Sequence, residues 1–373
     1  MAEREQGNQL SRRHFLRYAA GIVGAGAAFP LLSACAPQQA APAATQAPKA
    51  AEATKAPAAA TQAPAAPKSG AKIVLKFGHV LAPTEPIHQA AEAWGKKVAE
   101  RTNGEAEIQV FPSSSLGNNR DTYEQALLGA PVLCHADPGY MMDYVPDFGV
   151  LNGPFIVEDF AQFDKIIASD LFADLKKRLA EKGLLVLAFN WAFGQRHLIA
   201  GKPIPNPDAM KGMKFRVPPN QMWVETIKAM GGTPTPLEWA EVYSGLAQGV
   251  VDGAEAPLST LWGSKLYEVK KVITLTGHFK ALTGIVVGNQ FWKTLPEGVR
   301  KVVEEEAVNH GKIATQQVLK MEGEWKTKLE KEGGVTFAQS DVAAFQKATE
   351  VVYTKFPDWT PGLHERVKAI LKG

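Results

Sequence analysis

The chain has 373 residues, of which 45% are hydrophobic and 21% are charged, and its formal net charge is +3. These values are typical of a soluble globular protein, and the length allows one large domain or two ordinary ones. Residues 1–34 and 36–70 each carry a net charge of +2, which leaves −1 for residues 71–373. We therefore expect no nucleic-acid partner for the folded part of the chain.

Residues 1–34 have the features of an export signal. Residues 11–16 read S-R-R-H-F-L, a pattern typical of a twin-arginine signal, and an apolar segment follows. That segment, residues 18–34, is too short and too interrupted by glycine and proline for a membrane span of roughly 20 residues. It ends in L-S-A-C, which resembles the lipobox of bacterial lipoproteins. We expect twin-arginine export and lipid anchoring through Cys35 at the outer face of the cytoplasmic membrane, in a periplasm or at a cell surface, with a simple secreted protein as the alternative.

Residues 35–70 are predicted to form a disordered tether. Positions 36–70 contain 16 Ala and 6 Pro, and they lack Leu, Ile, Val and aromatic residues. A segment of this composition cannot bury a hydrophobic core. At about 3.1 Å per residue it would reach at most ~110 Å from the anchor. The folded body, residues 71–373, would then move in solution near a membrane surface.

The body begins with alternating strand and helix patterns. Hydrophobic periodicity predicts strands at 73–80, 106–111 and 184–191, and helices at 86–101 and 118–128. Further helices are predicted at 221–230, 237–248 and 296–332, and the sequence GGTPTP is expected to end the first of these. This order predicts an α/β fold in two lobes, with largely parallel sheets and long C-terminal helices. In such folds ligands bind at the carboxyl ends of strands, in the cleft between the lobes.

The stretch KGMKFRVPP, residues 211–219, contains the first candidate for a binding residue. Met213, Phe215 and Val217 alternate with Lys214 and Arg216, which by itself predicts a half-buried strand with both cations on a solvated face. Arg216, however, stands at the end of this strand, where a cleft is expected. That position favours a binding role for its guanidinium.

No pattern for metal or catalytic chemistry is present in the sequence. The histidines are scattered, and neither H-E-x-x-H, C-x-x-C, G-x-S-x-G nor a phosphate-binding loop occurs. Asp137, Asp252 and Glu255 are interpreted as surface or turn residues on this basis alone, and Cys134 as a small buried thiol. We expect no catalytic residue, metal or cofactor. What remains is a set suited to a small anion, comprising two guanidiniums, Arg196 and Arg216, and the flat side chain of Trp239.

Several motifs in order identify a family. The stretches MKGMKFRVPP, GGTPTPLEWAEVYSGLAQGVVDGAEAPL and KLYEVKKVITLTGH resemble the solute receptors of tripartite ATP-independent periplasmic (TRAP) transporters, the DctP type. The resemblance extends upstream through KFGH, FPSSSLGNNR and ALLGAPV, and so covers residues 72 to about 365. It implies two periplasmic-binding-protein-like lobes, discontinuous in sequence, that close over a small organic acid. Lobe I would comprise about 71–193 and 282–321, and lobe II about 194–281 and 322–373.

The resemblance also implies roles for individual residues. Arg216 matches the arginine that forms a bidentate salt bridge with the ligand carboxylate, and Arg196 matches a second cation nearby. Trp239 matches an aromatic residue that packs against the ligand, and Glu255 matches the acidic residue of the V-D-G-Q-E-N-P motif. Asn119 and Asp137 match positions where the other lobe makes polar contacts with the ligand, and His79 lies beside a further ligand position. Ala256 and Pro219 replace asparagines found in sialate binders, so we expect a smaller or more apolar carboxylate.

The partner implied by the resemblance is an ion-driven TRAP membrane complex, to which the receptor delivers its ligand. A sensor that signals to a membrane protein would use the same residues, so the sequence leaves this alternative open. An exported enzyme acting on organic acids is a third hypothesis, weakly favoured by the twin-arginine pattern. Replacing Arg216 by lysine would keep the charge but lose the planar fork, so we expect weaker carboxylate binding in that variant.

Overall fold

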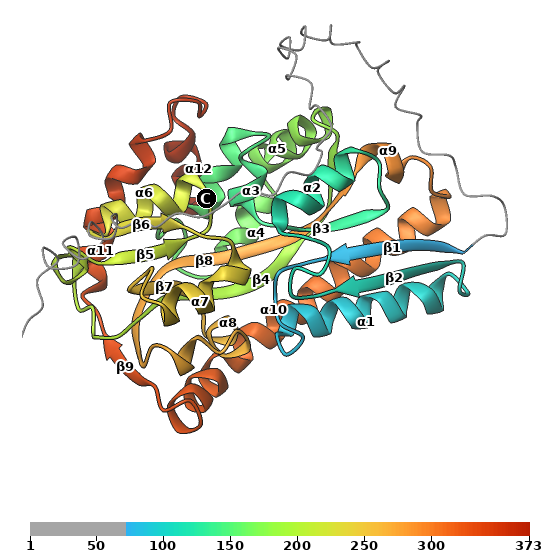
Figure 1. The fold of residues 1–373 in the computed structure, drawn as a ribbon. Coiled ribbons are helices and arrows are strands. Elements are labelled where there is room, and N and C mark those ends of the chain that lie inside the picture. The colour runs from blue at the N-terminus through green and yellow to red at the C-terminus, as the bar shows by residue number, and fades with distance from the viewer. Residues whose placement is uncertain (1–71) are drawn as a thin grey trace, which may run out of the picture. The chain divides into compact units, whose positions relative to one another are not determined.

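The computed structural model describes residues 72–373, so the predicted signal, Cys35 and the predicted tether lie outside the described residues. One mixed sheet organises the described part, in the strand order β2-β1-β3-β8-β4-β7-β5-β6, with β9 paired to β8 (Figure 1). The strands are β1 Ile73–Gly78, β2 Ala106–Phe111, β3 Val132–Ala136, β4 Leu184–Ala200, β5 Lys214–Val217, β6 Thr233–Pro236, β7 Gly253–Pro257, β8 Val272–Gly288 and β9 Thr336–Gln339.

Twelve α-helices cover this sheet in the described part. They are α1 Pro86–Arg101, α2 Asn119–Leu127, α3 Pro138–Met141, α4 Gln162–Ile167, α5 Asp170–Glu181, α6 Gln221–Ala229, α7 Val242–Ala247, α8 Leu258–Gly263, α9 Asn289–Trp292, α10 Glu297–Lys331, α11 Val342–Thr349 and α12 Leu363–Lys372. Short 3₁₀ helices occupy some of the connections, and they are η2 Pro146–Asn152, η3 Pro207–Met210, η4 Trp239–Glu241, η5 Leu266–Glu268 and η6 Glu350–Thr354. None of the described helices is both long and apolar enough to cross a membrane.

The sheet has two halves joined by two long strands. We call β2, β1 and β3 the first half, and β7, β5 and β6 the second half; they lie at opposite sides of Figure 1. Within each half the pairing is parallel, because α1, α2 and α6 return the chain to the same edge. The 17-residue strands β4 and β8 pair antiparallel between the halves. This confirms the two-lobed α/β fold, although the sheet is mixed rather than largely parallel.

The crossing strands are irregular where they pass between the halves. Their register shifts between Ala192 and Gly194, which pair with Leu282 and Ala281. Gly194 has φ +127°, a left-handed conformation that favours glycine. Such bulges bend a strand locally. This shift is one of four along β4, and the predicted lobe boundaries at 193/194 and 281/282 lie beside it; the predicted boundary at 321/322 lies within the continuous helix α10.

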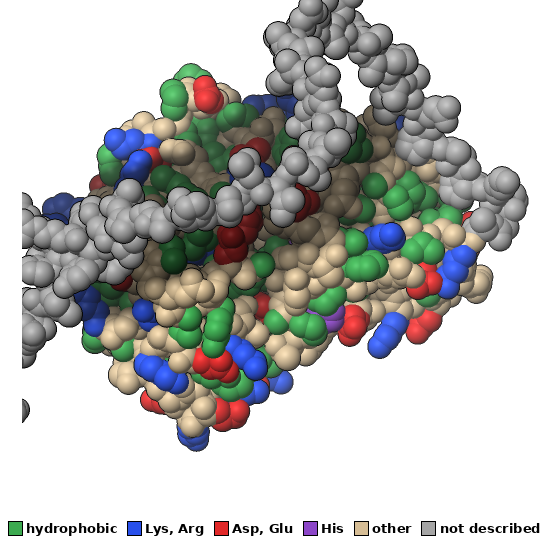
Figure 2. All heavy atoms as spheres, in the orientation of Figure 1, with side chains coloured by type: hydrophobic (Ala, Val, Ile, Leu, Met, Phe, Trp, Pro, Cys, Tyr) green, Lys and Arg blue, Asp and Glu red, His purple; other side chains and the backbone are tan. Residues whose placement is uncertain are grey.

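Three hydrophobic clusters support this arrangement. One, around β1, β2, α1 and the start of α10, fills the first half, and another, around β7, α8 and β9, supports the second. The largest cluster runs through the middle of the molecule, from β3 and α5 to β5 and α6. On the face shown in Figure 2, anionic and cationic side chains of the described residues are interspersed. Cys134 is fully buried, as predicted, and burial raises its pKa to about 12.

Three predicted elements differ from the structure, and one of them is the strand predicted at 184–191, which continues to Ala200 as β4. The helix predicted at 237–248 is shorter, because Trp239–Glu241 forms η4 and only Val242–Ala247 is α-helical. The stretch Thr233–Pro236 does more than end α6, since it forms strand β6 beside β5. Prolines are tolerated there because β6 is an edge strand of the sheet.

Candidate functional site

Arg216 is buried, and the structure corrects the expectation of a solvated cation. It lies in β5 with only 2% of its surface exposed. Its Nε donates a hydrogen bond to the Leu237 carbonyl at 2.9 Å, and its guanidinium carbon lies 5.0 Å from the centroid of the Trp239 ring. Burial lowers the pKa of Arg216 to about 10, so the group stays charged at neutral pH. No carboxylate among residues 72–373 forms an ion pair with it, and the cation is therefore free to take an anionic ligand.

Arg196, by contrast, pairs with a carboxylate of the protein. It lies in β4, beside β7, and its Nε and Nη2 donate to the two carboxylate oxygens of Glu255 at 2.5 and 2.7 Å. Nη2 also donates to the Glu255 carbonyl at 3.1 Å. Burial acts to raise the pKa of Glu255, but Arg196 and His278 outweigh it and lower that pKa to about 2. The positive charge of Arg196 is thus neutralised by the protein, and we assign this pair a structural role.

Asp137 and Asn119 come from the first half of the sheet. Asp137 caps α3, and its Oδ1 accepts hydrogen bonds from the Gly139 N–H at 2.7 Å and from Asn152 at 3.3 Å. Burial raises the pKa of Asp137 to about 6. Tyr140, on α3, lies near both Arg216 and Asn119. Burial raises the pKa of Tyr140 to about 12, although Arg216 and Asn119 each act to lower it. Tyr140 thus connects Asn119 with Arg216, whereas the charges that act on Asp137 are those of Arg196 and Glu255.

His79 is less suited to contact a ligand. Its Nδ1 accepts a hydrogen bond from the Leu81 N–H at 3.2 Å, and its Nε2 lies 3.1 Å from Nδ1 of His88. Burial, followed by the nearby rings of His135 and His88, lowers its pKa to about 3, so the ring is neutral. Because both ring nitrogens already have partners, we leave His79 out of the proposed site.

Three residues near the site were not identified from the sequence. His278, fully buried in β8, places Nε2 3.5 Å from the Glu255 carboxylate and Nδ1 2.7 Å from the Thr276 hydroxyl. Tyr140 follows Asp137 by three residues. Asn220 caps α6 and also donates to the carbonyl of Gly139 in the other half. The sequence contained one signal for Asn220: relatives that bind sialate have an asparagine at the position of Pro219, and in this chain the asparagine is the next residue.

The two halves are in contact on both sides of this cluster. Asn220 reaches Gly139 on one side, and a hydrogen bond joins Glu85 of the first half to Thr260 of the second on the other. Trp239, on η4, donates from Nε1 to the Ser264 hydroxyl at 3.1 Å, which fixes its ring against Arg216. The structure therefore represents a closed arrangement.

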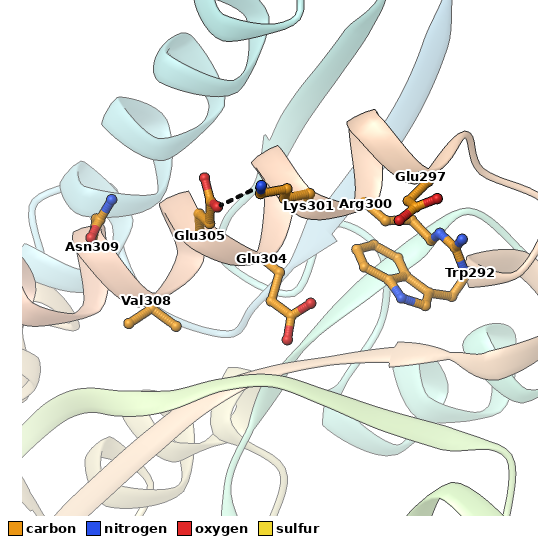
Figure 3. Close-up of a pocket in the computed structure, with 8 residues that line it drawn as sticks. All are labelled: Trp292, Glu297, Arg300, Lys301, Glu304, Glu305, Val308 and Asn309. Carbon is orange, nitrogen blue, oxygen red and sulfur yellow. Dashed lines mark ion pairs between the residues drawn. The ribbon is translucent and has the colours of Figure 1, made fainter.

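A separate hollow of about 760 Å³ lies on α10 beside α9, and neither Arg196 nor Arg216 lines it (Figure 3). Among the residues that line it, Lys301 and Glu305 form an ion pair at 4.0 Å. It contains none of the predicted site residues. No group of three or more His, Cys, Asp or Glu suited to a metal ion occurs within residues 72–373.

Comparison with solved structures supports the closed arrangement. A TRAP periplasmic solute-binding protein from Ochrobacterium anthropi with bound L-fuconate is 38% identical, with a TM-score of 0.79, over 81% of this chain and 100% of that one. Another, from Fusobacterium nucleatum with bound sn-glycerol 3-phosphate, is 33% identical with a TM-score of 0.78, over 80% and 97%. An apo open structure from Escherichia fergusonii is also 33% identical, over 80% of this chain and 99% of that one, but its TM-score is only 0.70. At equal identity, the chain is closer to the ligand-bound form.

The family model described as bacterial extracellular solute-binding protein, family 7 (DctP), matches residues 77–358. The match includes every candidate ligand residue, from His79 to Glu255. Both the motifs and the two-lobed fold agree with it. The chain therefore belongs to family 7 of the bacterial extracellular solute-binding proteins.

Proposed function

We propose that this protein is an extracytoplasmic receptor that captures a small monocarboxylate and delivers it to the membrane subunits of a TRAP transporter. The observation that supports this most directly is the buried Arg216, whose guanidinium lacks an anionic partner in the described part of the chain. A carboxylate that leaves water must recover its hydrogen bonds, and a planar guanidinium offers two parallel donors. In this proposal the two lobes close over the ligand and the receptor releases it unchanged.

The charges around Arg216 favour a ligand with a single negative charge. Arg196 is neutralised by Glu255, so it offers no charge to a second carboxylate. Asp137 lies near Arg196, the half-buried Glu238 lies near Arg216, and both carboxylates would repel a second one on the ligand. Asp137 uses only Oδ1 in its hydrogen bonds within residues 72–373, so Oδ2 can accept from a ligand hydroxyl. A monocarboxylic hydroxy acid fits this arrangement, and the solved relative with L-fuconate binds an acid of this kind.

A thermal-shift screen tests this proposal. Each acid is added to the purified protein at equal concentration, with matched pairs that differ by one carboxylate, such as glycerate and tartronate. A ligand at 100 times its dissociation constant stabilises the folded state by about 2.7 kcal/mol. We expect the monocarboxylate of a pair to give the larger rise in melting temperature. A response to dicarboxylates alone would contradict the charge argument, and no response to any carboxylate would contradict the proposed function.

Export and anchoring form the second part of the proposal. The S-R-R-H-F-L motif and the L-S-A-C sequence support twin-arginine export followed by acylation of Cys35. Replacing Cys35 with alanine is expected to move the protein from the membrane fraction to the soluble fraction without changing ligand affinity. Fractionation with immunodetection measures the first effect, and calorimetry measures the second. A Cys35→Ala protein that stays with the membrane would rule out acylation at this residue.

A further inference from the structure

Glu85 is a buried carboxyl group that the proposed ligand site does not use. It stands immediately before α1, with Pro86 at the first helical position, and only 1% of its surface is exposed. Although this position commonly caps a helix, its side chain makes no capping hydrogen bond to α1. Instead, Oε1 accepts a hydrogen bond from the Ala82 N–H at 3.0 Å within the connecting loop. The carboxyl group is thereby directed away from its own helix.

The other half of the molecule covers this carboxyl group. Thr260, in α8 after β7, donates its hydroxyl to Oε2 of Glu85 at 2.6 Å. Gly263, at the end of α8, lies so close that an added Cβ would come within 3.2 Å of both Glu85 Cγ and Ala82 Cβ. Since Ala82 and Glu85 belong to the first half and α8 to the second, this contact forms only when the halves are closed.

No cation neutralises Glu85 among residues 72–373. Arg196 is the cation that acts on it, but both of its donating nitrogens are bound to Glu255. Helix α8 and the segment 82–84 contain no titratable side chain, and on α1 His88 is bound to His79 and faces Glu92. Burial consequently dominates and raises the pKa of Glu85 from 4.5 to about 7, against the lowering effect of Thr260, Ala82 and Arg196.

We infer that closure of the two halves creates a proton-binding site at Glu85, so that the receptor takes up a proton when it captures its ligand. In an open form α8 moves away and water reaches the carboxyl group, which then ionises in the ordinary acidic range. In the closed form the neutral acid is favoured. The proton is thus a second ligand of the closed state, held at a place distinct from Arg216. The inference rests on the proposed capture of a ligand by closure.

The sign of the effect follows from linkage. The closed form holds more protons than the open form between the two pKa values, so closure becomes more favourable as pH falls. With pKa values of about 7 when closed and 4.5 when open, ligand affinity should rise about tenfold from pH 8 to pH 6. Above pH 8 the affinity should level off, because both forms are then ionised.

Calorimetry of ligand binding tests the inference. Titrations of the full-length receptor use the monocarboxylate with the largest thermal shift, in two buffers of different ionisation enthalpy. We expect about 0.9 proton to be taken up per ligand at pH 6 and about 0.1 at pH 8. Glu85→Gln mimics the neutral acid, so its proton uptake at pH 6 should be lower than that of the natural protein by about 0.9 proton, and its affinity should change less between the two pH values; Asp137, whose pKa burial raises to about 6, remains in both proteins. Absence of uptake in the natural protein, or equal uptake in both proteins, would overturn the inference.

A ligand-free measurement separates this inference from the proposed function. Cysteines at Ala82 and Gly263 would lie close enough to form a disulfide only in the closed form. The rate of cross-linking in Ala82→Cys/Gly263→Cys is compared with the rate in the same double variant that also carries Glu85→Gln. Because both proteins contain the same two thiols, their comparison at each pH removes the pH dependence of the thiols themselves. We expect the glutamine variant to cross-link much faster at pH 8, and its advantage to shrink to about fourfold at pH 5, where the open form is still partly ionised. Equal rates at both pH values would refute the proton site, whereas failure of every carboxylate to bind would refute only the ligand proposal.

Discussion

Replacing Arg216 with methionine is expected to lower carboxylate affinity by about thirtyfold to a few thousandfold while leaving the ligand-free protein as stable as before. Loss of one partner from a buried charged hydrogen-bonded pair costs about 2–5 kcal/mol of binding free energy, and here the ligand would lose both donors of the guanidinium. The free protein, by contrast, already carries the cost of burying this cation without an anionic partner. Methionine removes that cost and fills a similar volume against Trp239.

Two measurements check this prediction. Calorimetry gives the affinity, and urea denaturation gives the free energy of unfolding without ligand. Lys214→Met is the matched control, since it removes a cation from the exposed end of the same strand and should change neither quantity by more than about 0.5 kcal/mol. Arg216→Lys keeps the charge but not the two parallel donors, so its affinity should fall between those of the other proteins. Unchanged affinity in the methionine variant would remove Arg216 from the site.

Local patterns predicted the elements that depend on local sequence. The apolar periodicity and the Pro86 start place α1 at its observed bounds, and α10 differs from its prediction by one residue at each end. The errors arise where tertiary contacts override propensity. The TPTP segment becomes strand β6 because β5 offers it an edge, and η4 is held in place by contacts of Trp239 with Arg216 and Ser264.

The site was predictable in its residue types but not in its pairing. The alternation within KFRV predicts that Arg216 lies on a polar face of its strand. That this face is buried depends on the fold, in which β5 lies between β7 and β6, and the sequence pattern does not indicate it. The partnership of Arg196 with Glu255 joins residues 59 positions apart, and no spacing rule indicates it. Glu85 is similar, because its burial depends on Thr260, which lies 175 positions away in the other half.

The contrast between the two arginines leads to the second large effect, which concerns stability. Arg196→Met is expected to lower the free energy of unfolding by about 3–5 kcal/mol, because it leaves the Glu255 carboxylate buried without its cation. In the natural protein His278 adds little positive charge beside Glu255 at neutral pH, since burial lowers the pKa of its ring. The double variant Arg196→Met/Glu255→Leu removes both charges and should recover most of the loss, because apolar pairs of similar volume often match a buried ion pair in stability.

The pH dependence of unfolding distinguishes this charge effect from a packing defect. The pKa of Glu255 is lowered from 4.5 in the unfolded chain to about 2 in the folded protein, so the ion pair contributes fully above pH 4.5 and is lost as pH falls towards 2. The natural protein should therefore lose stability over this range more steeply than the double variant. In Arg196→Met, where Glu255 is buried without its cation, stability should instead rise as the pH falls and the carboxylate is neutralised. Denaturant titrations of the three proteins between pH 3 and pH 7 measure these slopes, and parallel curves would show that packing alone accounts for the loss.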